Sequence, residues 1–154
     1  SITKLMTALV VTSLKPDWQT NVQFIESDNR EGGIAYLIPG EEVTRNDLLS
    51  MSLVASANSA TAALARSTGL SAQEFVSKMN EKAKALGMND TIFIDPTGLD
   101  PGNVSTARDV ALLVRQSLAI PEIKNAVMRS SYQFTTKDGK IRTVRSTDDL
   151  LLNN

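Results

Sequence analysis

The fold is decided by residues 1–11, which read SITKLMTALVV. Arranged as a helix, this segment has apolar side chains on several sides, as is typical of a helix buried inside a protein. Ser1 stands at its start, where hydroxyl residues are favoured, and the run Lys15-Pro16-Asp17 marks its end. The sequence therefore predicts a buried opening helix.

Five more helices are predicted from capping and breaking signals. Thr44 caps a helix that begins near Asn46. Ser71 and Glu74 form a capping box for another helix, which Gly87 terminates. Ala60–Arg66 is a helical stretch rich in Ala. Another helix starts at Ser105 or Thr106 and includes Leu118, and a short one begins at Pro121.

Strand signals are fewer than helix signals. Asn21–Glu26 and Ala35–Ile38 are candidate short strands. Tyr132–Thr136 and Lys140–Val144 flank Asp138-Gly139, a pair of residues that favours a hairpin with a type I′ turn. The sum predicts an α+β fold dominated by helices, with too few strands for a large sheet.

The composition excludes several classes of protein. The chain has 154 residues, enough for one domain with a real core, and its formal net charge is −1. That balance leaves no basic footprint for nucleic acid or for an anionic membrane surface. The chain contains no His and no Cys, so it cannot hold a Ser-His-Asp triad or a thiolate site. Acid–base chemistry must come from Lys, carboxylates or Tyr.

Ser1 and Lys4 are the first candidates for chemistry. Three residues apart on a helix, they lie on one face and can touch. A serine hydroxyl becomes a good nucleophile only when a base takes its proton, and a neutral lysine amine can do so once burial lowers its pKa. A Ser-x-x-Lys match is common by chance, however, so this motif alone indicates little.

The run Ser56-Ala57-Asn58 lies at a break between an apolar helix and an Ala-rich one. A hydroxyl and a carboxamide at such a break can face a cleft, where one relays a proton and the other binds a peptide group. Taken alone, helix capping is the simpler explanation of these two residues. Ser27-Asp28-Asn29 has the same pattern, but it lies in a charged stretch and is expected to be a solvated turn.

The acidic residues give no convincing site. Glu41-Glu42 and Asp148-Asp149 suggest the paired carboxylates of glycoside hydrolysis, but adjacent acids are usually solvated surface. The stretch from Asp95 to Asp100 resembles a calcium loop only faintly, because it lacks the alternating oxygen ligands and the closing Glu.

The motifs taken as an ordered set resemble those of one known family. SITKLMT at residues 1–7 resembles the active-site motif of the low-molecular-mass penicillin-binding proteins, the serine D-alanyl-D-alanine carboxypeptidases. LVASANSA at residues 53–60 looks like their Ser-x-Asn segment. NDTIF at 89–93 with DPTGL at 95–99, and STARDVALL at 105–113, resemble further signatures. Each of these short motifs occurs often by chance, but together, in this order over nearly the whole chain, they are specific.

The resemblance implies a serine beta-lactamase/DD-peptidase-like transpeptidase fold of the α+β class, of which this chain would hold mainly the helical subdomain and a C-terminal hairpin. It also implies that Ser1 attacks the carbonyl between the two terminal D-alanines of a peptidoglycan stem peptide, with Lys4 as general base. Ser56 would carry the proton to the leaving D-alanine, and Asn58 would hydrogen-bond the substrate backbone. Beta-lactams would acylate the same serine.

Partners and location follow from the same resemblance. The expected partners are peptidoglycan stem peptides and beta-lactam antibiotics, with no nucleic acid, no membrane contact from these residues and no metal or organic cofactor. The expected location is extracytoplasmic, in the periplasm or on the outer face of the bacterial cytoplasmic membrane. The family's Lys-Thr-Gly motif is absent from residues 1–154. We therefore expect a partial catalytic domain, with central strands before residue 1 and after residue 154, that is inactive alone.

Several alternatives stay open. A DD-endopeptidase or a serine beta-lactamase of the same superfamily would use the same residues, although no Glu near Asp95–Asp100 matches the additional base of class A beta-lactamases. A non-catalytic module would bind peptidoglycan peptides without cutting them. An N-terminal nucleophile hydrolase would use the Ser1 amine as its base. A helical domain with no active site is the simplest alternative.

Overall fold

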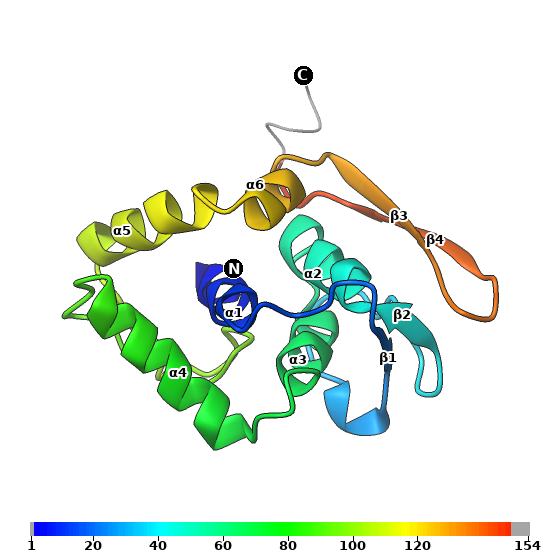
Figure 1. The fold of residues 1–154 in the computed structure, drawn as a ribbon, viewed down its shortest axis with the longest axis horizontal. Helices are drawn as coiled ribbons and strands as arrows, with labels where there is room; N and C mark the ends of the chain where they lie inside the picture. Colours follow the sequence, from blue (N-terminus) through cyan, green and yellow to red (C-terminus); the bar gives the residue numbers. More distant parts are fainter. Residues whose placement is uncertain (1, 149–154) are drawn as a thin grey trace.

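Helix α1 (Ile2–Ser13) runs through the middle of the molecule. In the computed structural model, which describes residues 2–148, the other helices surround α1 (Figure 1). Residues 6–11 are all buried. The prediction of a buried opening helix is confirmed, because a helix that is apolar on several sides needs neighbours on all of those sides.

Helices α2 (Arg45–Val54) and α3 (Asn58–Arg66) pack together beside α1 (Figure 1). The cap predicted for α2 is present: the Thr44 hydroxyl accepts a hydrogen bond from the backbone amide of Asp47, and the Asp47 carboxylate accepts one from the amide of Thr44. Helix α3 begins at Asn58, two residues earlier than its Ala-rich composition predicted. This early start places Asn58 in the first turn of the helix.

Three helices complete the ring around α1: α4 (Ala72–Ala85), α5 (Ala107–Leu118) and α6 (Pro121–Val127). Their predicted starts are confirmed by the Ser71–Glu74 capping box, by the Thr106 cap and by Pro121 in the first turn of α6. Gly87, with φ of 76°, follows the end of α4 in the left-handed region that glycine tolerates.

The first strand pair is β1 (Asn21–Gln23) and β2 (Glu42–Thr44), which run antiparallel with Val22 opposite Val43. A short 3₁₀-helix, η1 (Glu26–Asp28), follows β1. The predicted strand Asn21–Glu26 is thus confirmed over its first half only.

The predicted strand at residues 35–38 is wrong. The ladder of β1 continues through Phe24, whose amide donates to the carbonyl of Glu41 and whose carbonyl accepts from the amide of Gly40, both at 2.8 Å. The turn at residues 39–40 therefore brings Glu41 beside β1. Leu37 is buried and Ile38 is 56% exposed, and residues 35–38 pair with no strand within residues 2–148.

The predicted hairpin is present as β3 (Ser131–Thr135) and β4 (Ile141–Arg145), with Gln133 opposite Thr143. Its turn is not type I′, which requires positive φ at both central residues of a two-residue loop. Instead the amide of Thr136 donates to the carbonyl of Lys140 at 2.9 Å, and Gly139 alone has a positive φ within this loop. A three-residue loop ending in a left-handed glycine is the next most common hairpin connection.

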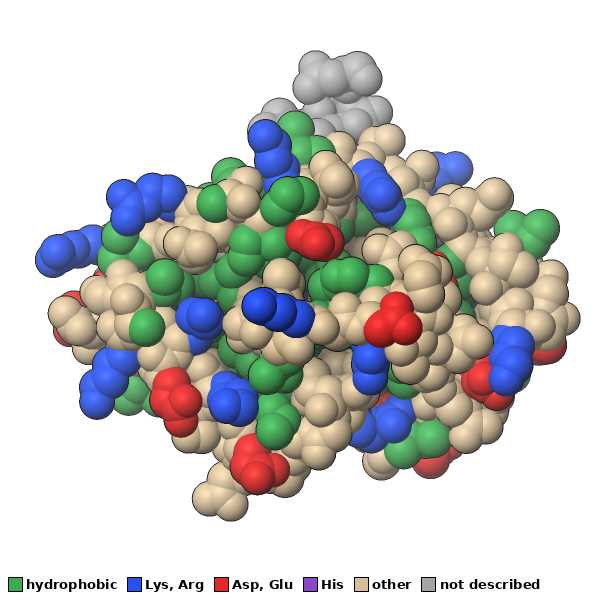
Figure 2. All heavy atoms as spheres, viewed as in Figure 1, with side chains coloured by type: hydrophobic (Ala, Val, Ile, Leu, Met, Phe, Trp, Pro, Cys, Tyr) green, Lys and Arg blue, Asp and Glu red, His purple; other side chains and the backbone are tan. Residues whose placement is uncertain are grey.

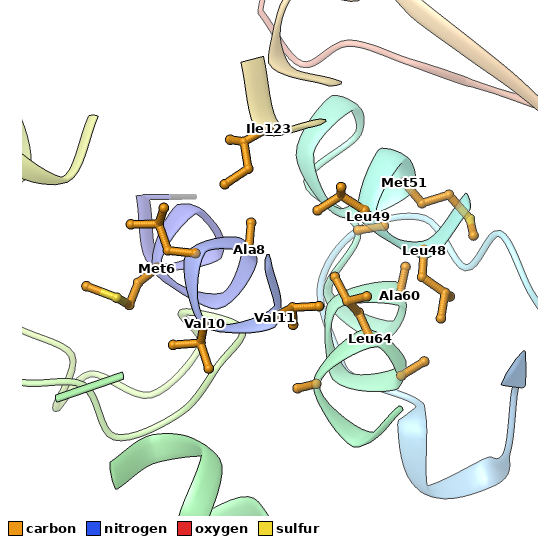
Figure 3. Close-up of a cluster of buried hydrophobic side chains, with 14 of the residues drawn as sticks. Met6, Ala8, Val10, Val11, Leu48, Leu49, Met51, Ala60, Leu64 and Ile123 are labelled. Carbon is orange, nitrogen blue, oxygen red and sulfur yellow. The ribbon is translucent and has the colours of Figure 1, made fainter. Parts of the chain in front are cut away.

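The core lies on both sides of α1 (Figure 3). Val11 points toward Leu64 of α3, whereas Met6 and Val10 point away from α2 and α3 (Figure 3). Ile123 of α6 lies near Ala8 (Figure 3). The side chains of Met6, Val10, Val11, Leu64 and Ile123 are all fully buried. The helix is therefore fixed by apolar packing on several of its sides.

Two carboxylates that the sequence placed at the surface are buried. Asp28 is 2% exposed and accepts two hydrogen bonds of 2.8 Å from the guanidinium of Arg66. Glu41 is 6% exposed and accepts two of 2.5 Å from Arg142 and one of 3.1 Å from Lys140. A buried carboxylate is tolerated when a cation and hydrogen bonds replace its water. Both pairs join segments distant in sequence, which no local pattern reveals.

The surface carries both signs of charge. On the face shown in Figure 2, the Lys and Arg side chains are interspersed with Asp and Glu. None of the helices within residues 2–148 is long and apolar enough to cross a membrane. The same residues contain no cluster of three or more acidic side chains that could hold a metal ion.

Candidate active site

Lys4 lies in the first turns of α1 with its side chain buried, at 2% exposure. Its Nζ donates one hydrogen bond of 2.7 Å to Oδ1 of Asn58 and another of 2.7 Å to the backbone carbonyl of Thr97. These contacts join α1 to the first turn of α3 and to the loop after residue 94. A buried lysine held by two uncharged acceptors is an unusual arrangement, because an ammonium ion normally seeks water or a carboxylate.

Burial lowers the pKa of Lys4 from 10.5 to about 8, and the negative charge of Asp95 opposes this effect by favouring the ammonium form. A substantial fraction of Lys4 is therefore neutral near pH 8. A neutral amine has two N–H groups and one lone pair. Asn58 and Thr97 can take these two N–H groups, which would direct the lone pair elsewhere to accept a proton.

Asn58 uses both ends of its side chain. Its Oδ1 accepts from Lys4, and its Nδ2 donates to the carbonyls of Glu31 at 3.1 Å and Gly32 at 2.8 Å. Gly32 has φ of 76°, which favours glycine there. Asn58 therefore links the amine of Lys4 to the exposed segment at residues 31–32. Before its amide donates to a ligand, one of these two carbonyls has to give way.

Ser56 lies in the break between α2 and α3, two residues before Asn58. Its φ of 52° is in the left-handed region, which costs a non-glycine residue about 1 kcal/mol or more. The side chain is half-buried. Backbone strain of this kind is concentrated at functional sites. The structure thus gives Ser56 a constrained backbone two residues before Asn58, which contacts the amine of Lys4.

The carbonyl of Thr97 is a part of the site that the sequence did not identify. It belongs to the loop that begins at Asp95, whose carboxylate accepts from the amide of Thr97 at 2.9 Å and from the amide of Gly98 at 3.1 Å. The neighbouring carbonyl of Pro96 accepts from the hydroxyl of Thr7 at 2.7 Å. The Asp-Pro-Thr-Gly run signals a tight turn. Nothing in the sequence indicates that this turn faces α1.

Ser1, the predicted nucleophile, lies outside the described residues. Of the other predicted site residues, Lys4 and Asn58 are in direct contact, and Ser56 lies two residues before Asn58 in the break between α2 and α3. Residues 2–148 thus supply a buried base, an amide and a hydroxyl, and none of their acidic side chains is hydrogen-bonded to the amine. Such a set can remove a proton from a nucleophile that lies within reach of Nζ.

The family model described as D-alanyl-D-alanine carboxypeptidase, peptidase S11, matches residues 1–154. The chain belongs to this family. Members of the family are serine hydrolases of bacterial cell-wall peptides, which include penicillin-binding proteins. The resemblance seen in the ordered motifs is therefore confirmed.

Relatives within the family differ in named activity. The chain is 41% identical to a D-alanyl-D-alanine endopeptidase of Escherichia coli, over 80% of this chain and 40% of the relative. It is 38% identical to a D-alanyl-D-alanine carboxypeptidase of Bacillus subtilis, over 80% of this chain and 33% of the relative. The chain thus spans less than half the length of these curated relatives.

Solved structures confirm the predicted fold. The Streptomyces K15 DD-transpeptidase superposes with a TM-score of 0.90 at 28% identity, covering 98% of this chain and 64% of that one. The fold of residues 2–148 is therefore that of the helical part of a DD-peptidase of the α+β class.

Proposed function

We propose that this chain carries the nucleophile and the general base of a serine-type D-Ala-D-Ala carboxypeptidase. The reaction removes the terminal D-alanine of a peptidoglycan stem peptide through an acyl-enzyme on Ser1. One observation carries the proposal: Lys4, three residues after Ser1, is a buried amine with a pKa of about 8 that donates to two uncharged acceptors within residues 2–148. A lysine of this kind is suited to accept a proton.

The steps follow from the properties of each group. The lone pair of Lys4 takes the proton of the Ser1 hydroxyl as the serine oxygen bonds to the carbonyl carbon of the scissile D-Ala-D-Ala bond. The resulting tetrahedral intermediate collapses when its C–N bond breaks. The departing amine of D-alanine receives the proton through the hydroxyl of Ser56. Water then attacks the Ser1 ester, which releases the shortened peptide and regenerates the serine.

Asn58 has two roles in this proposal. Its Oδ1 keeps the amine of Lys4 in place throughout the reaction. Its Nδ2, now bonded to the carbonyls of Glu31 and Gly32, donates instead to a backbone carbonyl of the bound stem peptide. The exchange replaces one amide–carbonyl hydrogen bond by another, so its cost is small.

Cleavage of cross-links by the same residues is a second candidate function. The identity to the E. coli endopeptidase, 41%, is similar to the 38% shared with the B. subtilis carboxypeptidase. An endopeptidase cuts a D-alanyl bond whose leaving group is another peptide, and Ser1 and Lys4 would act in the same way. Product analysis on a pentapeptide and on a cross-linked peptide dimer separates the two activities.

Beta-lactams and an extracytoplasmic site of action follow from the proposed reaction. A beta-lactam carries a strained amide in place of the D-Ala-D-Ala bond, and Ser1 would open it to form an ester. Peptidoglycan lies outside the cytoplasmic membrane, so we place the enzyme in the periplasm or at the outer face of that membrane.

The test treats the full-length protein that contains residues 1–154 with a fluorescent penicillin. Peptide mass spectrometry is expected to locate the adduct on Ser1. Ser1→Ala should abolish the adduct, and Lys4→Ala should slow its formation by at least about 100-fold, as expected for loss of a general base. Ser13→Ala, an exposed serine at the other end of α1, is the matched control and should label like the wild type.

Two results would overturn the proposal. One is a folded protein that forms no adduct but still binds a D-Ala-D-Ala peptide, which would favour a non-catalytic module. The other is an adduct that persists in Ser1→Ala, which would assign the nucleophile to a different residue.

A further inference from the structure

We propose that Asp95 is a positioning residue for Lys4: its carboxylate folds the loop that points the Thr97 carbonyl at Nζ, and its charge acts on the amine from this partly buried loop. This inference rests on the proposed role of Lys4 as a base. It concerns a residue that touches neither Nζ nor the predicted substrate contacts at Ser56 and Asn58.

The carboxylate of Asp95 organises its loop through five hydrogen bonds. Oδ2 accepts from the amide of Thr97 at 2.9 Å and from its hydroxyl. Oδ1 accepts from the amides of Gly98 at 3.1 Å and Asp100 at 3.3 Å, and from the side-chain amide of Asn103. A carboxylate with this many donors fixes the path of every residue between them. Thr97 is consequently held with its side chain turned to Asp95 and its carbonyl to Lys4.

The loop is fixed at its base as well. Asn103 accepts from the amide of Ile94 at 2.8 Å and donates to the carbonyl of Asp100 at 3.0 Å. On the side of α1, the Thr7 hydroxyl holds the carbonyl of Pro96. These contacts leave the Thr97 carbonyl little freedom to move away from Nζ. Positioning of the base is therefore built into the loop.

Asp95 is ionised despite its partial burial. Burial acts to raise the pKa of Asp95, but the hydrogen bonds from Thr97 and Asn103 outweigh that effect, and the pKa is lowered below its ordinary value. The resulting negative charge favours the ammonium form of Lys4 and limits the fall in its pKa that burial causes. A base whose pKa stays near the working pH accepts protons more effectively than one whose pKa has fallen far below it.

Other charged groups on the elements around α1 are engaged elsewhere. Asp47 on α2 binds Thr44 and Tyr132, Arg66 on α3 binds Asp28, and Asp109 on α5 binds the amide of Asp90 and the hydroxyl of Thr91. Other charged residues of α4 and α6 near α1 lie partly or fully in solvent: Lys78, Glu81, Lys82 and Glu122. Within residues 2–148, Asp95 is the charged residue whose charge acts on Lys4.

The experiment measures the titration of Lys4 directly by NMR, in protein labelled at the lysine side-chain carbon and nitrogen. The sample is the polypeptide that contains residues 1–154, and Lys4→Arg assigns the signal. In Asp95→Asn the midpoint of Lys4 is expected to fall by at least about half a pH unit, because a neutral amide no longer favours the ammonium. Asp100→Asn, in the same loop, is the matched control and should leave the midpoint unchanged.

A second measurement follows the rate of acylation by a penicillin as a function of pH. Asp95→Asn should lower the plateau rate about tenfold through looser positioning, and it should move the rising limb to lower pH together with the NMR midpoint. Asp95→Glu keeps the charge but displaces the loop. It should lower the plateau and leave the limb where it is in the wild type.

The outcomes separate this inference from the proposed function. If wild type is not acylated but the Lys4 midpoint falls in Asp95→Asn, the function is wrong and the coupling of Asp95 to Lys4 stands. If the midpoint is unchanged or rises, the inference is wrong whatever the activity. If Asp95→Asn does not fold, Asp95→Ser supplies the neutral variant, since a hydroxyl can keep the turn bond to Thr97. If neither folds, Asp95 serves folding alone and the inference is withdrawn.

Discussion

The buried amine of Lys4 makes a quantitative prediction about stability. Its pKa is about 8 in the folded protein, against 10.5 for a lysine side chain surrounded by water, as in the unfolded chain. Between these values the unfolded state binds a proton that the folded state does not, so the free energy of unfolding rises with pH. One pKa unit corresponds to about 1.4 kcal/mol of free energy. Protonation of Lys4 in the unfolded state therefore lowers the free energy of unfolding by about 3 kcal/mol below pH 8, and this loss disappears by about pH 10.5.

The assay is urea unfolding of the wild type and of Lys4→Met at several values between about pH 7 and pH 10. Methionine retains an apolar side chain of similar length without the amine. The wild type should gain about 2 to 3 kcal/mol relative to Lys4→Met over this range. The difference between the two proteins is needed because burial raises the pKa values of Tyr36 and Tyr132, which makes the folded protein less stable as pH rises.

A matched control is Ser13→Ala on the same helix, which changes no ionisable group, so its difference from wild type should not change with pH. A flat difference for Lys4→Met as well would refute the reasoning. It would mean that Lys4 keeps its proton in the folded state, and a permanently charged ammonium could not serve as the base. The proposed catalytic role would then fall with it.

Three further predictions concern backbone strain and the buried ion pairs. Ser56→Gly should be more stable than Ser56→Ala by about 0.5 to 1 kcal/mol in urea unfolding, because glycine tolerates φ of 52°. Both variants lose the hydroxyl and with it the proposed proton transfer. Equal stability of the two variants would show that the backbone of Ser56 is not strained. Arg66→Met should cost about 2 kcal/mol by thermal unfolding, since it leaves the carboxylate of Asp28 buried without its cation, whereas a loss under about 0.5 kcal/mol would show the pair to be dispensable. The pKa of Glu41 is lowered to about 2, mainly by its hydrogen bonds from Arg142, so Glu41 should contribute stability above about pH 4.5 that is lost as the pH falls toward 2. Glu41→Gln should remove this acid dependence from the melting temperature measured as a function of pH. An unchanged profile would contradict the lowered pKa of Glu41.

Local signals in the sequence predicted the helices well. The capping box of Thr44 and Asp47, the box of Ser71 and Glu74, and Pro121 at the start of α6 are each formed within a few residues. Their geometry depends on hydrogen bonds between near neighbours, so it can be predicted without knowing the fold. The hairpin turn was predicted less well, because its loop type depends on how the strands pair and not only on the presence of Asp138 and Gly139.

Patterns of charge were a poorer guide. Glu41 and Asp28 occur in polar runs typical of solvated surface, and both are buried against an arginine from another part of the chain. The same limit explains why residues 35–38 were wrongly predicted as a strand. A strand requires a partner, and Glu41 takes the position beside β1 that residues 35–38 would have needed.

The sequence by itself determined the family, the helical character of the chain and the candidates Lys4, Ser56 and Asn58. These follow from ordered motifs and from residue types whose chemistry is limited when His and Cys are absent. Only the tertiary structure decided that Nζ of Lys4 meets a side chain 54 residues away and a backbone carbonyl 93 residues away. A backbone carbonyl has no signature in the sequence, and the low pKa of the amine arises from burial by the packed helices. The motif therefore identifies Lys4 as the candidate base, whereas the lowered pKa of its amine is a property of the folded core.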